Sequence, residues 1–235
     1  MARTARLDNV THADLRVASG FGAAYGDAVN QMPLFLPEFA AAQRDYPILF
    51  QRQADGLLQA QAILGFDRDE NLFLDGARWS ARHIPAWARR GPFLIGLTGD
   101  EPLLHVDLDH PRIVAADSAD SLPVFLPHGG HARALEWAMQ ALREIHVGRE
   151  VMQAATPIFD ELGLVQPVAL EVSVTDSDVV RFEDFLAIEP ARIDALSGDA
   201  LARLNGAGLL QPAVLAAASL GNFGALAARK RALLG

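Results

Sequence analysis

Between residues 48 and 108 the chain alternates short apolar runs with turn-forming residues, and no other feature restricts the fold as strongly. Asp55-Gly56 and Asp75-Gly76 are residue pairs typical of tight hairpin turns. Because tight turns join antiparallel strands, whereas parallel strands need long crossover connections, the sheet is predicted to be largely antiparallel. Three hairpins are predicted, from runs at 48–50 and 57–64, at 72–74 and 78–79, and at 93–97 and 103–108.

After residue 130 the apolar period becomes that of a helix, with one apolar stripe from 135 to 152. We expect Pro157 to interrupt this helix and Gly163 to end the segment. Together the patterns predict an α+β fold, in which a largely antiparallel, β-rich N-terminal half (30–125) packs with a mainly helical C-terminal half (126–235) in a single unit over 1–235. The other predicted elements are strands at 168–174 and 182–188 and helices at 37–44, 85–90, 190–196, 199–205 and 212–234.

The composition excludes several classes of function. The chain has no cysteine, which excludes disulfides, thiol nucleophiles and thiolate metal sites. Its formal net charge of −9, from 29 acidic and 20 basic residues, argues against a surface that neutralises nucleic-acid phosphates. The most apolar stretch, 209–220, is shorter than the roughly 20 residues of a membrane span, and the N-terminus lacks the apolar run of a signal peptide. We therefore predict a cytoplasmic protein with no nucleic-acid partner and no membrane span.

Motifs for nucleotide cofactors and activated nucleophiles are also missing from the sequence. Neither a glycine-rich phosphate loop nor a G-x-S-x-G nucleophile elbow occurs. The sequence therefore favours a non-catalytic protein without a cofactor, and it offers no catalytic residue.

His105 and Asp107 carry the alternative hypothesis, an Fe(II)-dependent oxygenase. Residues two apart share one face of a strand, and a His and an Asp with this spacing can be two ligands of a two-His-one-carboxylate iron site. His128, His131 or His146 would supply the third ligand. The polar face of an antiparallel strand explains the same pattern, and we favour that interpretation.

Trp79, His83 and Trp87 precede Arg89 and Arg90 closely in the sequence. Aromatic rings beside guanidinium groups can stack on a flat ligand or a sugar, or grip a carboxylate. The amphipathic pattern favours the alternative, an exposed segment whose arginine side chains lie over the rings. The cluster is still the best candidate recognition surface in the sequence.

A series of short motifs runs in order along nearly the whole chain. The pieces are His12-Ala13-Asp14-Leu15-Arg16-Val17, Tyr46-Pro47-Ile48-Leu49-Phe50, Glu70-Asn71-Leu72-Phe73-Leu74, Trp79, Ile84-Pro85-Ala86, Arg89-Arg90-Gly91-Pro92-Phe93 and Ser219-Leu220-Gly221-Asn222. Their order and spacing resemble those of the bacterial SapC family. His83 and Gly91 depart from the family pattern, which usually has Tyr at both positions.

The resemblance implies an accessory or regulatory protein, linked to outer-membrane nutrient uptake or to a bacterial surface layer, and it carries over no catalytic residue. Asn71 is expected to fix a turn by bonding backbone groups nearby, and residues 219–222 are expected to be a close-packing point on one helix. We expect a protein partner or a small ligand to bind a face formed by Tyr46, Asn71, Trp79, His83, Arg89 and Arg90.

Overall fold

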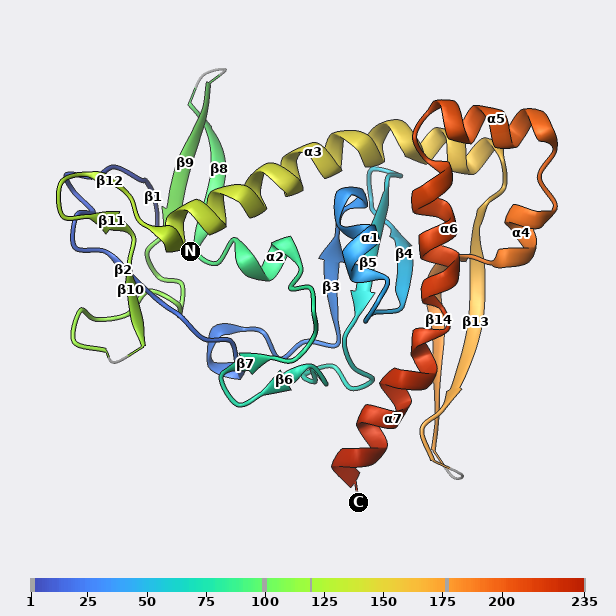
Figure 1. Ribbon diagram of the computed structural model, residues 1–235, viewed down its shortest axis with the longest axis horizontal. Coiled ribbons are helices and arrows are strands. Elements are labelled where there is room, and N and C mark those ends of the chain that lie inside the picture. Colours follow the sequence, from blue (N-terminus) through green and yellow to red (C-terminus); the bar gives the residue numbers. More distant parts are fainter. Residues whose placement is uncertain (1–2, 99–100, 119, 176–177, 235) are drawn as a thin grey trace. The chain divides into compact units, whose positions relative to one another are not determined.

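Strands within the described residues pair in antiparallel fashion, as the tight turns predict. The computed structural model describes residues 3–98, 101–118, 120–175 and 178–234. Antiparallel sheets dominate the first half of the chain and helices the second, which confirms the α+β class (Figure 1). The turns expected around residues 99–100 and 176–177 lie outside the described residues.

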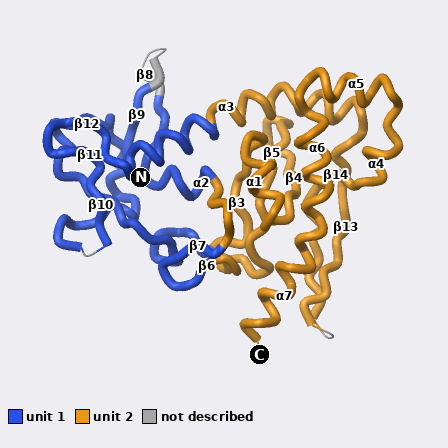
Figure 2. Tube along the Cα trace, viewed as in Figure 1, with its two compact units in different colours: residues 1–28, 74–80, 86–145 blue, residues 29–73, 81–85, 146–235 orange. Residues whose placement is uncertain are grey.

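The chain divides into two compact units, each assembled from three segments (Figure 2). Unit 1 comprises Met1–Ala28, Leu74–Ser80 and Ala86–Ile145, and unit 2 comprises Val29–Phe73, Ala81–Pro85 and His146–Gly235. The boundary between the units therefore crosses the chain several times and does not follow the change from strands to helices. A single α+β unit over 1–235 stays a prediction.

Unit 1 is built from small antiparallel sheets around one apolar cluster. Its three-stranded sheet has the order β1-β9-β8, and pairs β10-β2, β11-β12 and β6-β7 accompany it. The cluster consists of Val17, Phe93, Val106, Val124, Phe125, Leu135, Ala138 and Leu142. The elements are β1 (Thr4–Arg6), β2 (Arg16–Ala18), η1 (Ala23–Tyr25), β6 (Leu74–Asp75), β7 (Arg78–Trp79), α2 (Ala86–Arg89), β8 (Phe93–Thr98), β9 (Glu101–Asp107), β10 (Ser121–Pro123), β11 (Phe125–Leu126), β12 (Gly130–His131) and the first part of α3 (Arg133–Glu161).

Unit 2 contains a five-stranded antiparallel sheet with the order β13-β14-β4-β5-β3. Helix α6 packs against β4 and β14 and also touches α1, α4 and α5. Pro167 lies in β13, where a missing N–H is tolerated because β13 is an edge strand. The elements are β3 (Gln31–Leu34), η2 (Leu36–Glu38), α1 (Phe39–Ala42), β4 (Ile48–Arg52), β5 (Leu58–Ile63), β13 (Val165–Ser173), β14 (Val179–Ile188), α4 (Pro190–Asp194), α5 (Gly198–Gly206), α6 (Leu210–Ser219), α7 (Asn222–Leu234) and the second part of α3.

Helix α3 continues through Pro157 to Glu161, so the predicted interruption is wrong. Proline removes one hydrogen-bond donor from a helix, but Pro157 is exposed, so water can satisfy the carbonyl that loses its partner. Ala155 and Phe159 lie on the buried side of the same turns, and their packing holds the helix in register. The segment ends at Gly163, whose φ of 59° permits the left-handed turn, as predicted.

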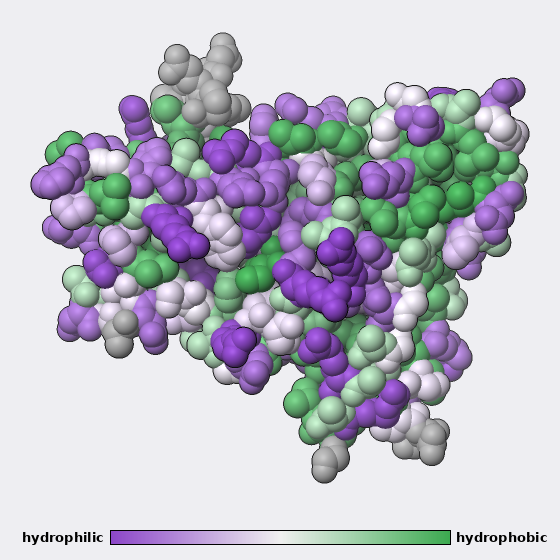
Figure 3. All heavy atoms as spheres, in the orientation of Figure 1, coloured by the Kyte–Doolittle hydropathy of each residue, from purple (hydrophilic) through white to green (hydrophobic). Residues whose placement is uncertain are grey.

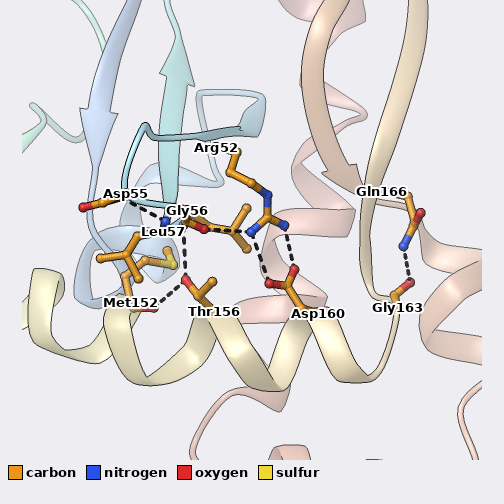
Figure 4. A network of polar contacts seen from close by, with 10 residues as sticks. Arg52, Asp55, Gly56, Leu57, Met152, Thr156, Asp160, Gly163 and Gln166 are labelled. Carbon is orange, nitrogen blue, oxygen red and sulfur yellow. Dashed lines mark hydrogen bonds and ion pairs between the residues drawn. The ribbon is translucent and has the colours of Figure 1, made fainter.

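The C-terminal part of α3 is tied to the β4–β5 hairpin by polar contacts (Figure 4). The Thr156 hydroxyl accepts a bond from the Leu58 N–H (3.2 Å) and donates to the Met152 carbonyl (2.9 Å). Arg52 and Asp160 form a two-bond ion pair, with N–O distances of 3.1 and 2.6 Å. These contacts come from both the exposed and the buried sides of the helix, and they attach it to the hairpin on either side of Pro157.

The predicted helix over 212–234 is instead two helices, α6 and α7, separated at Leu220 and Gly221. Together they form an apolar stretch, Leu210–Leu234, whose mean hydropathy reaches 1.3 in an 18-residue window, long and apolar enough to cross a membrane by length and composition alone. Figure 3 shows apolar side chains gathered over α5 and α6. The stretch is longer than the sequence analysis expected, but such a criterion is weak, because a core helix also passes it, and 39% of the window is buried.

Candidate recognition pocket

The six residues predicted to form a recognition face divide between the two units. Trp79, Arg89 and Arg90 belong to unit 1, whereas the other three, Tyr46, Asn71 and His83, belong to unit 2.

Tyr46 and His83 belong to a buried polar network in unit 2. The Tyr46 side chain is fully buried, and its hydroxyl donates to the backbone carbonyl of His83. The His83 Nε2 atom lies 2.9 Å from Oε1 of Glu38, a buried carboxylate whose other oxygen accepts the Phe35 N–H at 3.0 Å. The network anchors residues 81–85 on η2 and on Tyr46, which precedes β4, so these side chains stabilise the fold of unit 2.

Asn71 acts on its own turn, as expected from its position. Its Oδ1 accepts the backbone N–H of Phe73 at 3.0 Å, and the side chain is buried. The Phe73 ring in turn packs edge-on against Tyr46, with 4.8 Å between ring centroids. The contacts of Asn71 thus connect the turn to the same buried region of unit 2.

In unit 1, Trp79 stands at one end of a row of aromatic contacts. It is buried, and its ring meets Phe21 edge-on at 5.5 Å between centroids. Phe21 also meets Trp137 of α3 edge-on at 6.3 Å. Arg112 lies over the Phe21 ring and Arg89 over the Trp137 ring.

The structure corrects the expectation that Arg89 lies on an exposed segment. Only 8% of its side chain is exposed, and its guanidinium forms an ion pair with Glu144 of α3. The same group lies 5.9 Å from the centroid of the Trp137 ring. In helix α2 the Arg89 side chain is directed toward Glu144 of α3 rather than toward solvent.

Arg90 is the most unusual charge in unit 1. Its guanidinium stacks on Trp87 at 4.1 Å from the ring centroid, and Nη1 donates to the Phe93 carbonyl at 3.1 Å. Its Nε atom is buried and has no hydrogen-bond partner among the described residues. Burial lowers the pKa of Arg90 below its ordinary value, because a buried cation loses hydration, and the negative charge of Asp107 opposes that shift.

Arg112 is a third arginine of this site, and the sequence analysis did not identify it. The side chain is buried, and its Nη2 lies 2.6 Å from Oδ2 of Asp27. Its guanidinium also lies 4.8 Å from the Phe21 ring and 5.0 Å from the Tyr25 ring. No local sequence pattern indicates that Arg112 pairs with Asp27, because the two residues are 85 positions apart in the chain.

The three arginines line one pocket of unit 1, with a volume of about 60 Å³. Phe21 and Trp137 line it as well, so guanidinium groups meet aromatic walls there. Two of the three cations have a carboxylate partner, Glu144 for Arg89 and Asp27 for Arg112. Such a pocket is suited to an anionic group, because guanidinium presents paired donors that match a carboxylate or a phosphate.

His105 and Asp107 lie on one face of β9, as their spacing predicts, while Val106 between them enters the apolar cluster. His105 packs across Gly96 of β8, where an added Cβ would approach its Nδ1 to 2.5 Å. Asp107 accepts the Asp109 N–H at 3.1 Å. Over the described part of the chain, no three His, Asp or Glu side chains gather into a metal-binding group, so the iron alternative has no third ligand there.

Comparison with known proteins now decides the family. The profile of the SapC family matches residues 7–226 of the 235. The chain belongs to the SapC family. No curated protein and no solved structure matches it.

Two of the SapC motifs meet in unit 2, which sequence reasoning did not foresee. Ser219 at the end of α6 is fully buried, and its Oγ accepts the Ile48 N–H at 2.9 Å. Asn222 at the start of α7 donates through Nδ2 to the carbonyls of Gln43 (2.8 Å) and Tyr46 (3.0 Å). Residues 219–222 are thus a polar latch on the start of β4, where the sequence analysis expected small residues in close packing on one helix.

Proposed function

We propose that this SapC-family chain is a non-catalytic accessory protein that recognises an anionic group on a small ligand or a protein partner, using the guanidinium pocket of unit 1. One observation carries the proposal. Arg90 is half-buried and lines that pocket; among the described residues its guanidinium has no carboxylate within ion-pair distance, and its buried Nε atom has no hydrogen-bond partner.

Removing even part of a cation from water is costly. A buried charged group is expensive unless it is paired and hydrogen-bonded. Stacking on Trp87 and one bond to the Phe93 carbonyl compensate Arg90 only in part. An incoming anion would supply the missing counter-charge and accept the N–H of Nε. The unpartnered Nε donor of Arg90 therefore favours a site completed by binding.

The cellular role follows from the family alone and belongs to the same proposal. We place the protein in the cytoplasm, as an accessory or regulatory factor for outer-membrane nutrient uptake. Cell fractionation tests this part. A purely cytoplasmic pool supports it, and recovery in the surface layer would point to a structural role in that layer instead.

A comparative pull-down from native lysate tests the recognition itself. The bait proteins are the wild type, Arg90→Gln, and a matched control, Arg143→Gln, which changes an exposed arginine of unit 1. A partner or ligand retained by wild type and control but lost from Arg90→Gln supports the proposal. Equal capture by all three proteins contradicts it. Metal analysis of wild type and His105→Ala is an independent test, because stoichiometric iron that is lost on His105→Ala would overturn the non-catalytic proposal.

A further inference from the structure

An apolar groove lies beside the guanidinium pocket within unit 1. Its volume is about 630 Å³, within the range of roughly 300–1,000 Å³ that is usual for small-molecule sites. Leu122, Pro123, Leu126, Ala134 and Trp137 line most of it. Apart from Arg133, the lining residues carry no charge, so the groove offers almost entirely apolar surface to whatever occupies it.

The large side chains of this groove are open to solvent. Leu122 is 42% exposed, Leu126 52% and Trp137 41%. Single exposed apolar residues are ordinary, but a contiguous apolar surface in a hollow commonly marks a binding site. These three side chains come from β10, β11 and α3, and the fold brings them together from separate elements of the unit.

The groove and the pocket adjoin each other, because Leu122, Ala134 and Trp137 line both. An apolar groove therefore lies next to a small space bordered by three guanidinium groups, of which only that of Arg90 lacks a carboxylate partner within the described chain. The pocket, with about 60 Å³ against about 630 Å³ for the groove, is the smaller of the two spaces. Its size favours a compact anionic group over a large headgroup.

We infer that unit 1 binds a small amphiphile with a single carboxylate on an apolar chain or ring. This inference rests on the proposed function and specifies its ligand. The carboxylate occupies the guanidinium pocket, where a planar two-oxygen group matches the donors of arginine. The apolar part lies along Trp137 and the leucines of the groove. The pocket thus matches the charge of such a ligand, and the adjoining groove matches its apolar part.

Titration with a series of carboxylates tests the chemistry directly. Decanoate, octanoate and hexanoate, each below its critical micelle concentration, are followed by tryptophan fluorescence and calorimetry, with acetate and 1-decanol as comparison ligands. Affinity should fall by about two- to fourfold per methylene removed, the scale expected for buried apolar surface. Acetate lacks the apolar part and 1-decanol lacks the charge, so both should bind at least about 100-fold more weakly than decanoate.

Two substitutions separate the two ends of the site. Arg90→Gln should weaken decanoate binding by about tenfold or more, since bonds to charged groups are the strong ones. Leu126→Gln, on an exposed side chain, should leave the fold intact and flatten the dependence of affinity on chain length. The matched controls are Arg143→Gln in unit 1 and Leu233→Gln, which changes a leucine that is 72% exposed in unit 2. Both controls should bind decanoate as the wild type does.

The possible failures of the inference and of the proposed function differ. If acetate binds as tightly as decanoate and depends on Arg90, the groove plays no part and the amphiphile inference is wrong, while anion recognition stands. If a protein partner is captured through Arg90 but no carboxylate of the series binds, the ligand class is wrong and recognition stands. If 1-decanol binds as tightly as decanoate, the guanidinium pocket is not used, and both ideas fail.

Discussion

The two units of this SapC-family chain differ in the kind of buried polar atom that is left without a hydrogen bond. Among the described residues, each unit holds one buried side-chain atom without a hydrogen-bond partner, Gln61 Oε1 in unit 2 and Arg90 Nε in unit 1. Gln61 is neutral, and its Nε2 still donates to Gln51 at 3.2 Å. Arg90 is charged, so the unmet donor there is the more costly one.

Hydrogen bonding therefore distinguishes family motifs whose polar atoms maintain the fold from motifs whose polar atoms are available for binding. In unit 2, side-chain polar atoms form hydrogen bonds with backbone groups of the same unit, as in Tyr46, Ser219 and Asn222. In unit 1, the Nε donor of Arg90, which lines the pocket, has no hydrogen-bond partner among the described residues. A shared motif is therefore no guide to function until its hydrogen bonds are known.

The largest loss of stability is predicted at Arg112, because in unit 1 this arginine forms a buried ion pair with Asp27. Arg112→Met removes the cation that Asp27 faces at 2.6 Å and should lower the free energy of unfolding by about 3–5 kcal/mol, because a carboxylate stays buried without its counter-charge. Urea unfolding measures the loss, and the exposed Arg143→Met should change stability by no more than about 0.5 kcal/mol. An unchanged midpoint for Arg112→Met would show that the pair is not needed.

A smaller loss is predicted for the polar latch in unit 2. Asn222→Ala removes two bonds to backbone carbonyls and should cost about 2 kcal/mol of stability. If the latch only maintains the fold, capture of the unit 1 ligand should be unaffected at temperatures below unfolding. Asn205→Ala, on an exposed position of α5, is the matched control. Loss of ligand binding in folded Asn222→Ala would break the division of roles between the units.

Much of the fold was predictable because its signals are local. Asp55-Gly56 indicated the β4–β5 hairpin, and the alternation of Val168 and Val172 with polar neighbours indicated β13. The continuation of α3 through Pro157 was not predictable, because it depends on tertiary burial of the adjacent residues. Propensity is a weak guide wherever packing decides.

The candidate site was only half predictable for the same reason. Trp79, Arg89 and Arg90 were visible as a cluster close together in the sequence. Arg112 and Trp137 reach the same pocket from other parts of unit 1, and no periodicity links them to Arg90. The six residues expected on one face divide between two units, because closeness in sequence and membership of one motif series do not imply one structural unit.

Arg89 offers a further test of unit 1, with a moderate expected effect. Its ion pair with Glu144 is mostly buried, so Arg89→Ala should lower the free energy of unfolding by about 1–2 kcal/mol, where an exposed arginine would give less than about 0.5 kcal/mol. Thermal melts beside Arg143→Ala measure the difference. Equal melting temperatures for the two variants would mean that the Arg89 pair adds nothing to the stability of unit 1.

Asn71 should show a still smaller effect in unit 2. Asn71→Ala removes one acceptor from the Phe73 N–H and should destabilise the protein by about 1 kcal/mol. Binding by unit 1 should remain unchanged, since the contact lies within unit 2. The melting temperature and the decanoate titration, measured on the same sample, separate the two outcomes. A binding defect without a change in stability would return Asn71 to the recognition surface.

The smallest predicted effect is on the pH dependence of stability, and it comes from His110, a partly buried histidine of unit 1. Burial, reinforced by the positive charges of Arg112 and Arg90 and opposed by Asp107 and Asp27, lowers the pKa of His110. The unfolded chain therefore binds more protons than the folded one between that lowered pKa and about 6.5, and stability falls as the pH drops through this window.

His110→Gln should remove this contribution to the pH dependence. The wild type should lose stability between about pH 7.5 and about pH 5.5, and His110→Gln should lose less over the same range, as measured by urea unfolding at each pH. Nδ1 of the neutral His110 ring also accepts the backbone N–H of Arg112 at 3.1 Å, and protonation of this nitrogen would remove that bond. His146→Gln, whose side chain is 63% exposed, should keep the wild-type pH dependence. If the two variants show the same pH dependence of stability, the surroundings of His110 do not govern its protonation. Unit 1 then does not differ from unit 2 in the effect of a histidine on the pH dependence of stability.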